Sequence, residues 1–225
     1  DAQESRGLGD VYKRQFQCVG TGHEPSFISN SGFRGNGINQ YLNTGWNPLT
    51  SSLKYAYQNA SFAIDAAATG NFDGMDEMGT TYGNGTVVQF RVNGNQFLAS
   101  INRGTYVAAV IPAPNGMIFA SALGVSNKGF RNGVLIAQDS AGSGPLDSFG
   151  TMLICCLNYY LSPTAFTDSL IKMVSFGSAL SGKELAFYNA WNSYKSGIAA
   201  MSVDLTVMIG TDGLDNGYKN AGSIE

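Results

Sequence analysis

Six Asn-Gly dipeptides divide this chain into short segments, and they constrain its fold more than any other feature. Asn-Gly is the strongest short-range hairpin signal, because a type I′ turn needs a positive φ at both central residues. The dipeptides begin at residues 36, 84, 93, 115, 132 and 216, and the strand-like runs between and beside them are 40–44, 61–66, 86–92, 96–101, 105–111, 117–123, 134–138, 151–157 and 170–176. Nine or more strands separated by turns predict an all-β sandwich or barrel.

Composition agrees with a turn-rich β protein and excludes two classes of partner. Charged residues make up 13% of the chain and 29 of its 225 residues are glycine, against averages of about 25% and about 7%. The net charge is −3 and the longest basic cluster is "YKR" at 12–14, so we expect no nucleic-acid binding. Because no apolar run approaches the roughly 18 residues that span a bilayer, we expect no membrane insertion.

One segment near the C-terminus predicts a helix. Ser181 and Glu184 have the spacing of a capping box, and Leu180 precedes them as a hydrophobic staple. Gly197 follows Lys195 as a C-cap. The pattern predicts a helix over about 182–196 that packs a face of Leu185, Tyr188 and Trp191 against the sandwich.

The three cysteines cannot all pair within one molecule. Cys155 and Cys156 lie inside an apolar run, where free thiols usually serve as small buried hydrophobic side chains. The alternatives are a strained vicinal disulfide and an intermolecular bridge; the third cysteine is Cys18.

Three segments together resemble one family. They are "SGFRGNGINQYLNTGWNP" at 31–48, "FRNGVLI" at 130–136 and "MVSFGSALSGKELAFYNAWNSY" at 173–194. In this order they resemble the opening strand, the central hairpin and the closing strand and helix of concanavalin A-like, laminin-G-like jelly-roll domains. The resemblance implies a jelly-roll sandwich of two antiparallel sheets with one short helix near the C-terminus. The most similar subgroup occurs in bacteriophage structural proteins and bacterial surface proteins.

The resemblance also divides the chain. Residues 16–198 form the expected jelly-roll domain, and 199–225 form an extension with one added strand-like run, "MSVDLTVMIG" at 201–210. The stretch "GLGDVYKRQ" at 7–15 resembles translated sequencing-adapter sequence from environmental DNA, so residues 1–15 are expected to be non-native or disordered. A polar N-terminal tail is the alternative.

Catalysis is not expected. Glucanases of this fold carry an E-x-D-x-E strand that places three carboxylates on one face, and none of the five glutamates begins such a strand. His23 is the only histidine and lies in "GTGHEP" without a nucleophile motif, which favours a solvated loop residue.

The acidic residues suggest a cofactor instead. Asp73, Asp76 and Glu77 form a candidate calcium site, with Asp212 and Asp215 as a weaker one. Solvated acidic loops are the alternative.

Sugar binding needs aromatic faces beside planar hydrogen-bonding groups. The candidate ligand-binding residues, which we expect in loops, are Trp46, Tyr55, Tyr57, Asn71, Phe72, Tyr82 and Asn84. Aromatic core positions are the competing interpretation, and it stays open for Trp46 and Tyr82. "NYY" at 158–160 follows a strand and is expected in an exposed loop.

The sequence therefore predicts a non-enzymatic module that binds a glycan or host-surface polysaccharide, as part of a virion or cell-surface protein. The alternative is a purely structural or decoration protein of a phage particle that contacts other virion proteins. A glucanase-like hydrolase is the third and weakest hypothesis.

Overall fold

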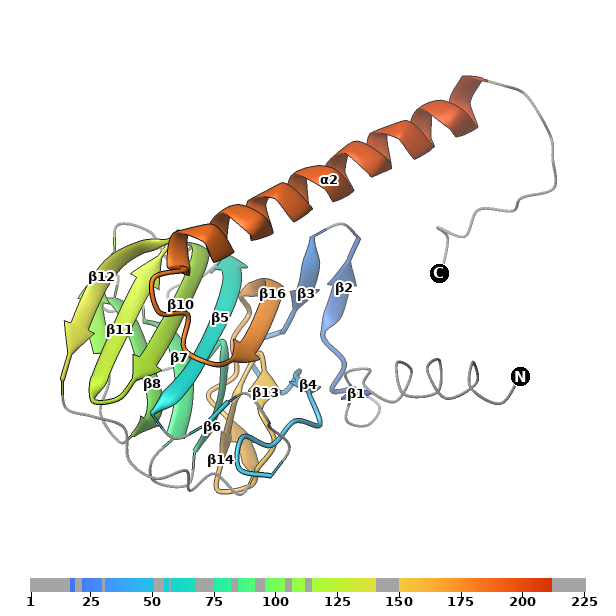
Figure 1. Cartoon of the computed structure of the whole chain (residues 1–225). Helices are drawn as coiled ribbons and strands as arrows, with labels where there is room; N and C mark the ends of the chain where they lie inside the picture. Colours follow the sequence, from blue (N-terminus) through green and yellow to red (C-terminus); the bar gives the residue numbers. More distant parts are fainter. Residues whose placement is uncertain are drawn as a thin grey trace, which may run out of the picture. The chain divides into compact units, whose positions relative to one another are not determined.

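The computed structural model divides the chain into two units, Asp1–Tyr188 and Asn189–Glu225. The residues that the structure describes are 17–18, 22–29, 31–50, 55–56, 58–67, 75–81, 85–91, 96–103, 107–111, 115–140 and 150–211. The first unit is an all-β sandwich, as the sequence predicts (Figure 1).

Within the described residues, the first sheet has nine strands. Its main path runs through β1 (Gln17–Cys18), β4 (Leu42–Asn43), β13 (Leu153–Ile154), β6 (Met78–Thr81), β7 (Gly85–Arg91), β8 (Gln96–Arg103) and β9 (Val107–Val110). The hairpin of β14 (Leu157–Tyr159) and β15 (Ser162–Thr164) branches from β6. β14 runs parallel to β6, whereas the other described pairs in both sheets are antiparallel.

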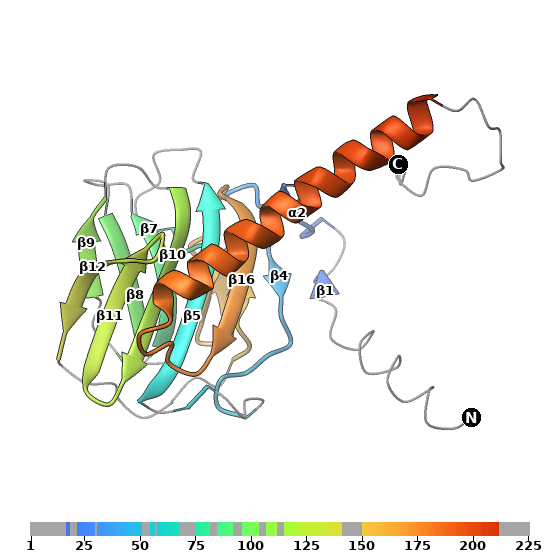
Figure 2. The same ribbon diagram turned by 45° about the horizontal axis from the view of Figure 1, so that its top comes forward.

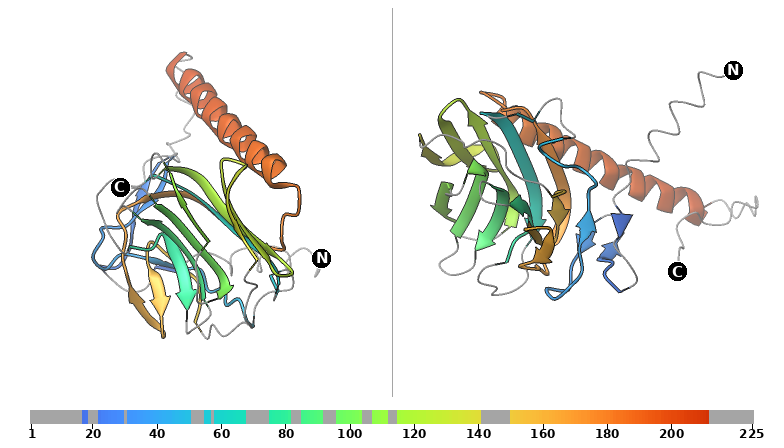
Figure 3. Two further views of the ribbon diagram at one scale, coloured as in Figure 1. Left: turned by 90° about the vertical axis from the view of Figure 1, so that its left-hand side faces the viewer. Right: turned by 90° about the horizontal axis from the view of Figure 1, so that it is seen from below.

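The second sheet has seven strands in the part of the chain that the structure describes. Their order is β12 (Val134–Asp139), β11 (Ser126–Arg131), β10 (Asn115–Leu123), β5 (Asn59–Ala67), β16 (Leu170–Gly177), β3 (Gly32–Arg34) and β2 (Ser26–Ile28). Figure 2 shows this sheet in front of β7, β8 and β9, and Figure 3 shows the two layers from other directions.

The main core lies between the two layers. Phe62 and Ile64 of β5 belong to the same buried cluster as Ile118 of β10, and Phe97 and Ile101 of β8 join it from the other sheet. Alternate residues of a strand point to opposite faces, so the even-numbered positions of β5 and β10 line this core.

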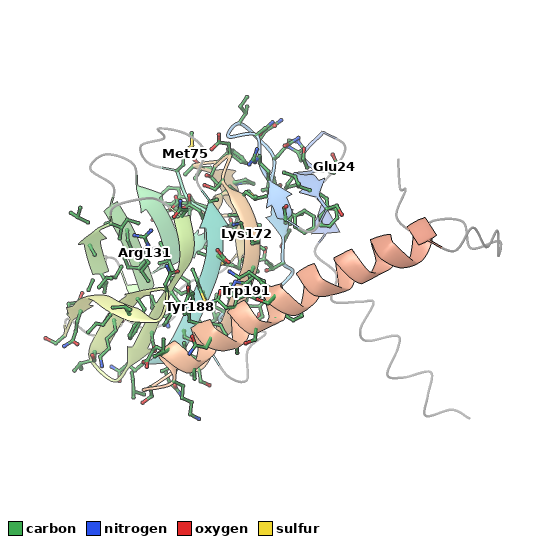
Figure 4. The ribbon with its side chains drawn as sticks, turned by 90° about the horizontal axis from the view of Figure 1, so that it is seen from above. Glu24, Met75, Arg131, Lys172, Tyr188 and Trp191 are labelled. Carbon is green, nitrogen blue, oxygen red and sulfur yellow. The ribbon has the colours of Figure 1, made fainter. Side chains whose placement is uncertain are left out.

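The opposite face of the second sheet is also buried at its centre. The rings of Phe119 and Phe130 stack with their centroids 4.7 Å apart, and Phe187 approaches Phe119 edge-on at 6.1 Å. Because both faces of β10 are covered, its sequence "MIFASAL" is an apolar run rather than an alternation. Figure 4 labels Tyr188 at this end of the helix and Arg131 on β11.

The single helix of the described residues, α2 (Glu184–Thr211), differs from the predicted one at both ends. Ser181 and Gly182 have φ angles of 41° and 83°, and the N–H of Lys183 donates to the carbonyl of Leu180 at 3.2 Å. This is the pattern of a type I′ turn, so Ser181 is a turn residue and the capping-box prediction is wrong. Gly197 lies inside the helix, and the predicted strand at 201–210 is helical.

The predicted helix face is confirmed in part. Leu185 and Tyr188 pack against Gly133 in the turn between β11 and β12, where an added Cβ would approach both residues. Phe187, which lies outside the predicted face, makes the ring contact with Phe119. Trp191 belongs to the second unit, where it stacks on Tyr194 at 5.6 Å and lies 5.4 Å from Nζ of Lys195. Of the described helices, none is long and apolar enough to cross a membrane.

The Asn-Gly predictions have mixed outcomes. Asn132 and Gly133, at φ 50° and 80°, form the predicted turn between β11 and β12. The strands flanking Asn93, β7 and β8, pair as the predicted hairpin, although the dipeptide itself lies outside the described residues. Asn115 and Gly116 begin β10 instead of making a hairpin turn. Of the dipeptides that begin at 84 and 216, only Gly85 lies within the described residues.

Candidate functional site

Two of the predicted sugar-binding aromatics lie in or against the core. Tyr55 is 2% exposed, and its hydroxyl donates to Oδ1 of Asn102 at 3.1 Å. Trp46 is half-buried, stacks on Phe176 with centroids 4.6 Å apart and meets Tyr55 edge-on at 5.2 Å. Both residues lie in loops, as expected, but Tyr55 is buried and has no ring face to offer a sugar. The structure favours the core interpretation for Trp46.

The remaining predicted ligand-binding residues lie outside the described part of the chain. They are Tyr57, Asn71, Phe72, Tyr82 and Asn84. Their roles stay predictions. Tyr82 and Asn84 follow β6 directly in the sequence, since that strand ends at Thr81.

Of the candidate calcium ligands, Asp76 and Glu77 are described and both are 1% exposed. Oε1 of Glu77 accepts hydrogen bonds from Ser169 Oγ at 3.0 Å and Thr167 Oγ1 at 3.5 Å. These contacts give Glu77 a structural role, because a buried carboxylate needs hydrogen-bond donors. Within the described residues no group of three or more His, Cys, Asp or Glu could hold a metal ion. Asp73, Asp212 and Asp215 lie outside that part.

Cys155 and Cys156 are free, buried thiols, as the sequence predicts. Cys155 has a φ of 69° and lies between β13 and β14, so the predicted strand over 151–157 is two short strands. Burial raises the pKa of the Cys155 thiol to about 12; a backbone hydrogen bond with Gly35 opposes the shift and Glu77 adds to it. Burial also raises the pKa of Cys156, with smaller contributions from Cys155 and Asp76.

His23 is tied into the fold rather than fully solvated. It is half-buried, its Nδ1 lies 2.8 Å from the carbonyl oxygen of Asn39, and its own carbonyl accepts the N–H of Tyr41 at 3.0 Å. These bonds join two segments near β4, which is a structural role.

The candidate site is the tip of the β14–β15 hairpin. Here Tyr159, Tyr160 and Leu161 are 50%, 47% and 66% exposed. We call residues 157–164 the tyrosine hairpin. The two rings meet edge-to-face with centroids 4.5 Å apart, which gives a paired aromatic surface at one edge of the first sheet.

The turn of the tyrosine hairpin has an unusual backbone. Tyr160 and Leu161 have φ angles of 50° and 65°, between the paired residues Tyr159 and Ser162. Positive φ at both central residues belongs to a type I′ turn, which normally contains Asn or Gly. Bulky side chains at these positions cost of order 1–3 kcal/mol each, and such strain clusters at ligand-binding sites.

Buried neighbours hold the hairpin in place. The N–H of Tyr160 donates to the carbonyl of Thr81 at 3.1 Å, which extends the parallel pairing of β14 with β6. Asn158 is 6% exposed, and its Nδ2 donates to the carbonyl of Thr151 at 2.8 Å. Gly150 packs directly against the Asn158 amide, where an added Cβ would collide with Nδ2. The exposed rings therefore stand on a fixed base.

The sequence predicts an exposed loop at "NYY" but does not mark it as a ligand-binding segment. Asn158 and Tyr159 belong to strand β14, so the loop prediction holds for Tyr160 alone, whereas the predicted exposure holds for Tyr159 and Tyr160. No sequence signal marks this turn, because Tyr160 and Leu161 stand where Gly or Asn is usual.

No family model matches the chain, and no curated protein matches it. Similarity appears among solved structures. The CBM40 domain of the Ruminococcus gnavus IT-sialidase superposes with a TM-score of 0.52 at 16% identity, covering 71% of this chain and 97% of that domain. The fold is that of a lectin-like jelly-roll sandwich. The same domain bound to α2,3-sialyllactose gives a TM-score of 0.50 at 18% identity, covering 72% of this chain and 94% of the domain.

Larger proteins contain a similar domain. The HCR/D W1238A mutant gives a TM-score of 0.54 at 10% identity, over 79% of this chain and 47% of that one. A Trypanosoma rangeli sialidase gives 0.51 at 9% identity, over 72% of this chain and 28% of the enzyme. The chain thus spans less than half of either protein. At identities this low, the superpositions establish a shared fold and no more.

Proposed function

We propose that this protein is a carbohydrate-binding module. The observation that carries the proposal is the sandwich of the first unit, which matches a sialidase CBM40 domain over nearly all of that domain's length. A structure of that domain holds α2,3-sialyllactose. Fold alone does not determine function, so the proposal also depends on a surface suited to sugars, and the tyrosine hairpin supplies exposed aromatic rings.

The module acts by binding and not by hydrolysis in this proposal. A retaining glycosidase needs two carboxyl groups about 5–5.5 Å apart across a cleft. Asp76 and Glu77 are adjacent in the chain and both are buried, and the Glu77 carboxylate accepts bonds from two hydroxyl groups. The similar sialidase corresponds to this chain over a minor part of its length, which supports a binding domain and not a catalytic one.

We further propose that the module belongs to a virion or cell-surface protein and binds a host glycan there. The support is the resemblance of segments 31–48, 130–136 and 173–194 to phage and bacterial surface domains. A structural protein of a phage particle is the second candidate. Val134 and Leu135, both exposed on the edge strand β12, favour it because exposed apolar residues at a sheet edge suit protein contacts.

A glycan-array screen of the chain, with and without calcium, tests the proposal. Specific binding to a defined set of glycans is the expected result. A blank array from protein that unfolds cooperatively would overturn the carbohydrate-binding function and favour the structural role. A calcium requirement would support the site predicted at Asp73, Asp76 and Glu77.

A further inference from the structure

We propose that the tyrosine hairpin is the carbohydrate contact site and that it takes a neutral pyranose. This inference rests on the proposed function and adds the position of the site and the class of sugar. The Trp46 and Tyr55 rings contact Phe176 and each other. The hairpin instead presents Tyr159 and Tyr160 about half exposed.

The two rings suit the face of a sugar. A pyranose has C–H groups on a face and hydroxyl groups around its rim, so it stacks on an aromatic ring while its hydroxyls bond to polar groups. Because the rings of Tyr159 and Tyr160 meet edge-to-face at 4.5 Å, one ring can carry the sugar face while the other borders it. Leu161 adds apolar surface beside them.

The backbone holds this surface ready before a ligand arrives. The strained turn at Tyr160 and Leu161 persists because Asn158 is buried and bonded beneath it and Tyr160 is bonded to Thr81. A fixed binding surface loses less conformational entropy on binding than a mobile loop does. In this proposal the strained turn keeps the two rings fixed for binding.

The hairpin and the described strand beside it carry no charged side chains, which bears on the class of sugar. Neither the hairpin, "LNYYLSPT", nor the adjoining strand β6, "MGTT", contains Lys, Arg, Asp or Glu. Binding a sialic-acid carboxylate would call for a charge-assisted hydrogen bond from Arg or Lys. The uncharged composition of these two segments supports a neutral sugar, in contrast to the α2,3-sialyllactose held by the similar CBM40 domain.

The test compares variants on an array that pairs neutral oligosaccharides, lactose among them, with their sialylated counterparts, such as 3′-sialyllactose. The variants are Tyr159→Ala and Tyr160→Ala. Tyr194→Ala on α2 is the matched control, because that tyrosine is 60% exposed and lies on a different element. Urea unfolding of each variant checks that it remains folded.

The wild type is expected to bind neutral glycans, and each hairpin variant to bind roughly tenfold more weakly, the change that follows from losing about 1.4 kcal/mol. The control is expected to bind as the wild type does. A blank wild-type array would overturn the proposed function itself. Binding that both folded hairpin variants retain would overturn the site alone, and binding confined to sialylated glycans would overturn the class of sugar.

Discussion

The indole of Trp46 stacks on the ring of Phe176, with centroids 4.6 Å apart and ring planes 9° from parallel. This contact joins the segment after β4 to the core-facing side of β16. Replacing Trp46 with Ala should lower the free energy of unfolding by about 3 kcal/mol, because an aromatic ring leaves a cavity behind. Urea denaturation measures the loss. At temperatures where the variant is folded, its glycan affinity should equal that of the wild type. A Trp46→Ala protein with normal stability and no glycan binding would show instead that Trp46 contacts the sugar.

Gly129 of β11 lies against Phe97 across the sandwich. A Cβ added to Gly129 would come within 2.5 Å of Cε1 of Phe97, a ring that is completely buried. Gly129→Ala should therefore lower the free energy of unfolding by about 1–3 kcal/mol through overpacking. Gly177→Ala is the control, since no atom lies within 4 Å of the added Cβ and the φ of Gly177 is not positive. Equal stability of the two variants would show that Phe97 moves aside freely.

Replacing Leu161 with glycine should stabilise the folded protein. An L-residue in the left-handed region costs roughly 1–2 kcal/mol, whereas the extra backbone freedom of glycine costs about 0.5–1 kcal/mol. Leu161→Gly should thus raise the free energy of unfolding by up to about 1.5 kcal/mol. It should also weaken glycan binding, because the tip loses its rigidity and an apolar side chain. Ser162→Gly, at the next residue and without a positive φ, should lower stability. If Leu161→Gly destabilised the protein equally, the turn would not be strained.

The thiols of Cys155 and Cys156 should be unreactive in the folded protein. In a Cys18→Ser background, a thiol reagent at pH 8 should modify neither until urea unfolds the chain, since both are buried and only the thiolate reacts. Rapid modification of the native protein would contradict their burial.

The raised pKa of the Cys155 thiol makes the stability of the folded protein depend on pH. The pKa of Cys155 is raised from 9.0 to about 12 in the folded protein, so the native state holds this proton more tightly than the unfolded state. The contribution is fully present below pH 9 and is lost progressively between about pH 9 and 12. Unfolding midpoints across that range should fall more steeply for the Cys18→Ser protein than for its Cys155→Ala derivative.

Local patterns in the sequence predict most strands of the sandwich but not the details of the helix. Turn chemistry is local, so Asn132-Gly133 could be recognised without knowledge of the fold. The capping box failed because Ser181 and Gly182 satisfy a turn equally well, and Gly197 is tolerated inside a helix at a cost of about 1 kcal/mol relative to alanine. The local sequence pattern therefore does not fix where the helix begins or where it ends.

The site was less predictable for a related reason. Whether Trp46 faces solvent or core depends on Phe176, which is remote in the sequence, and sequence spacing carries no trace of that contact. Tyr160 and Leu161 have no propensity for positive φ, so their turn could be found only in the structure. Only the exposure of Tyr159 and Tyr160 was predictable, from their place after an apolar run; Tyr159 itself belongs to β14.

The most direct test of the account is an NMR titration of the isotope-labelled chain with the neutral glycan that gives the strongest array signal. The account predicts saturable shifts of the backbone amides of Tyr159, Tyr160 and Leu161 and of the adjoining Thr81, with the core amides around Phe62 unchanged. Saturable shifts confined to other residues, such as those around Trp46, with a silent hairpin would contradict it.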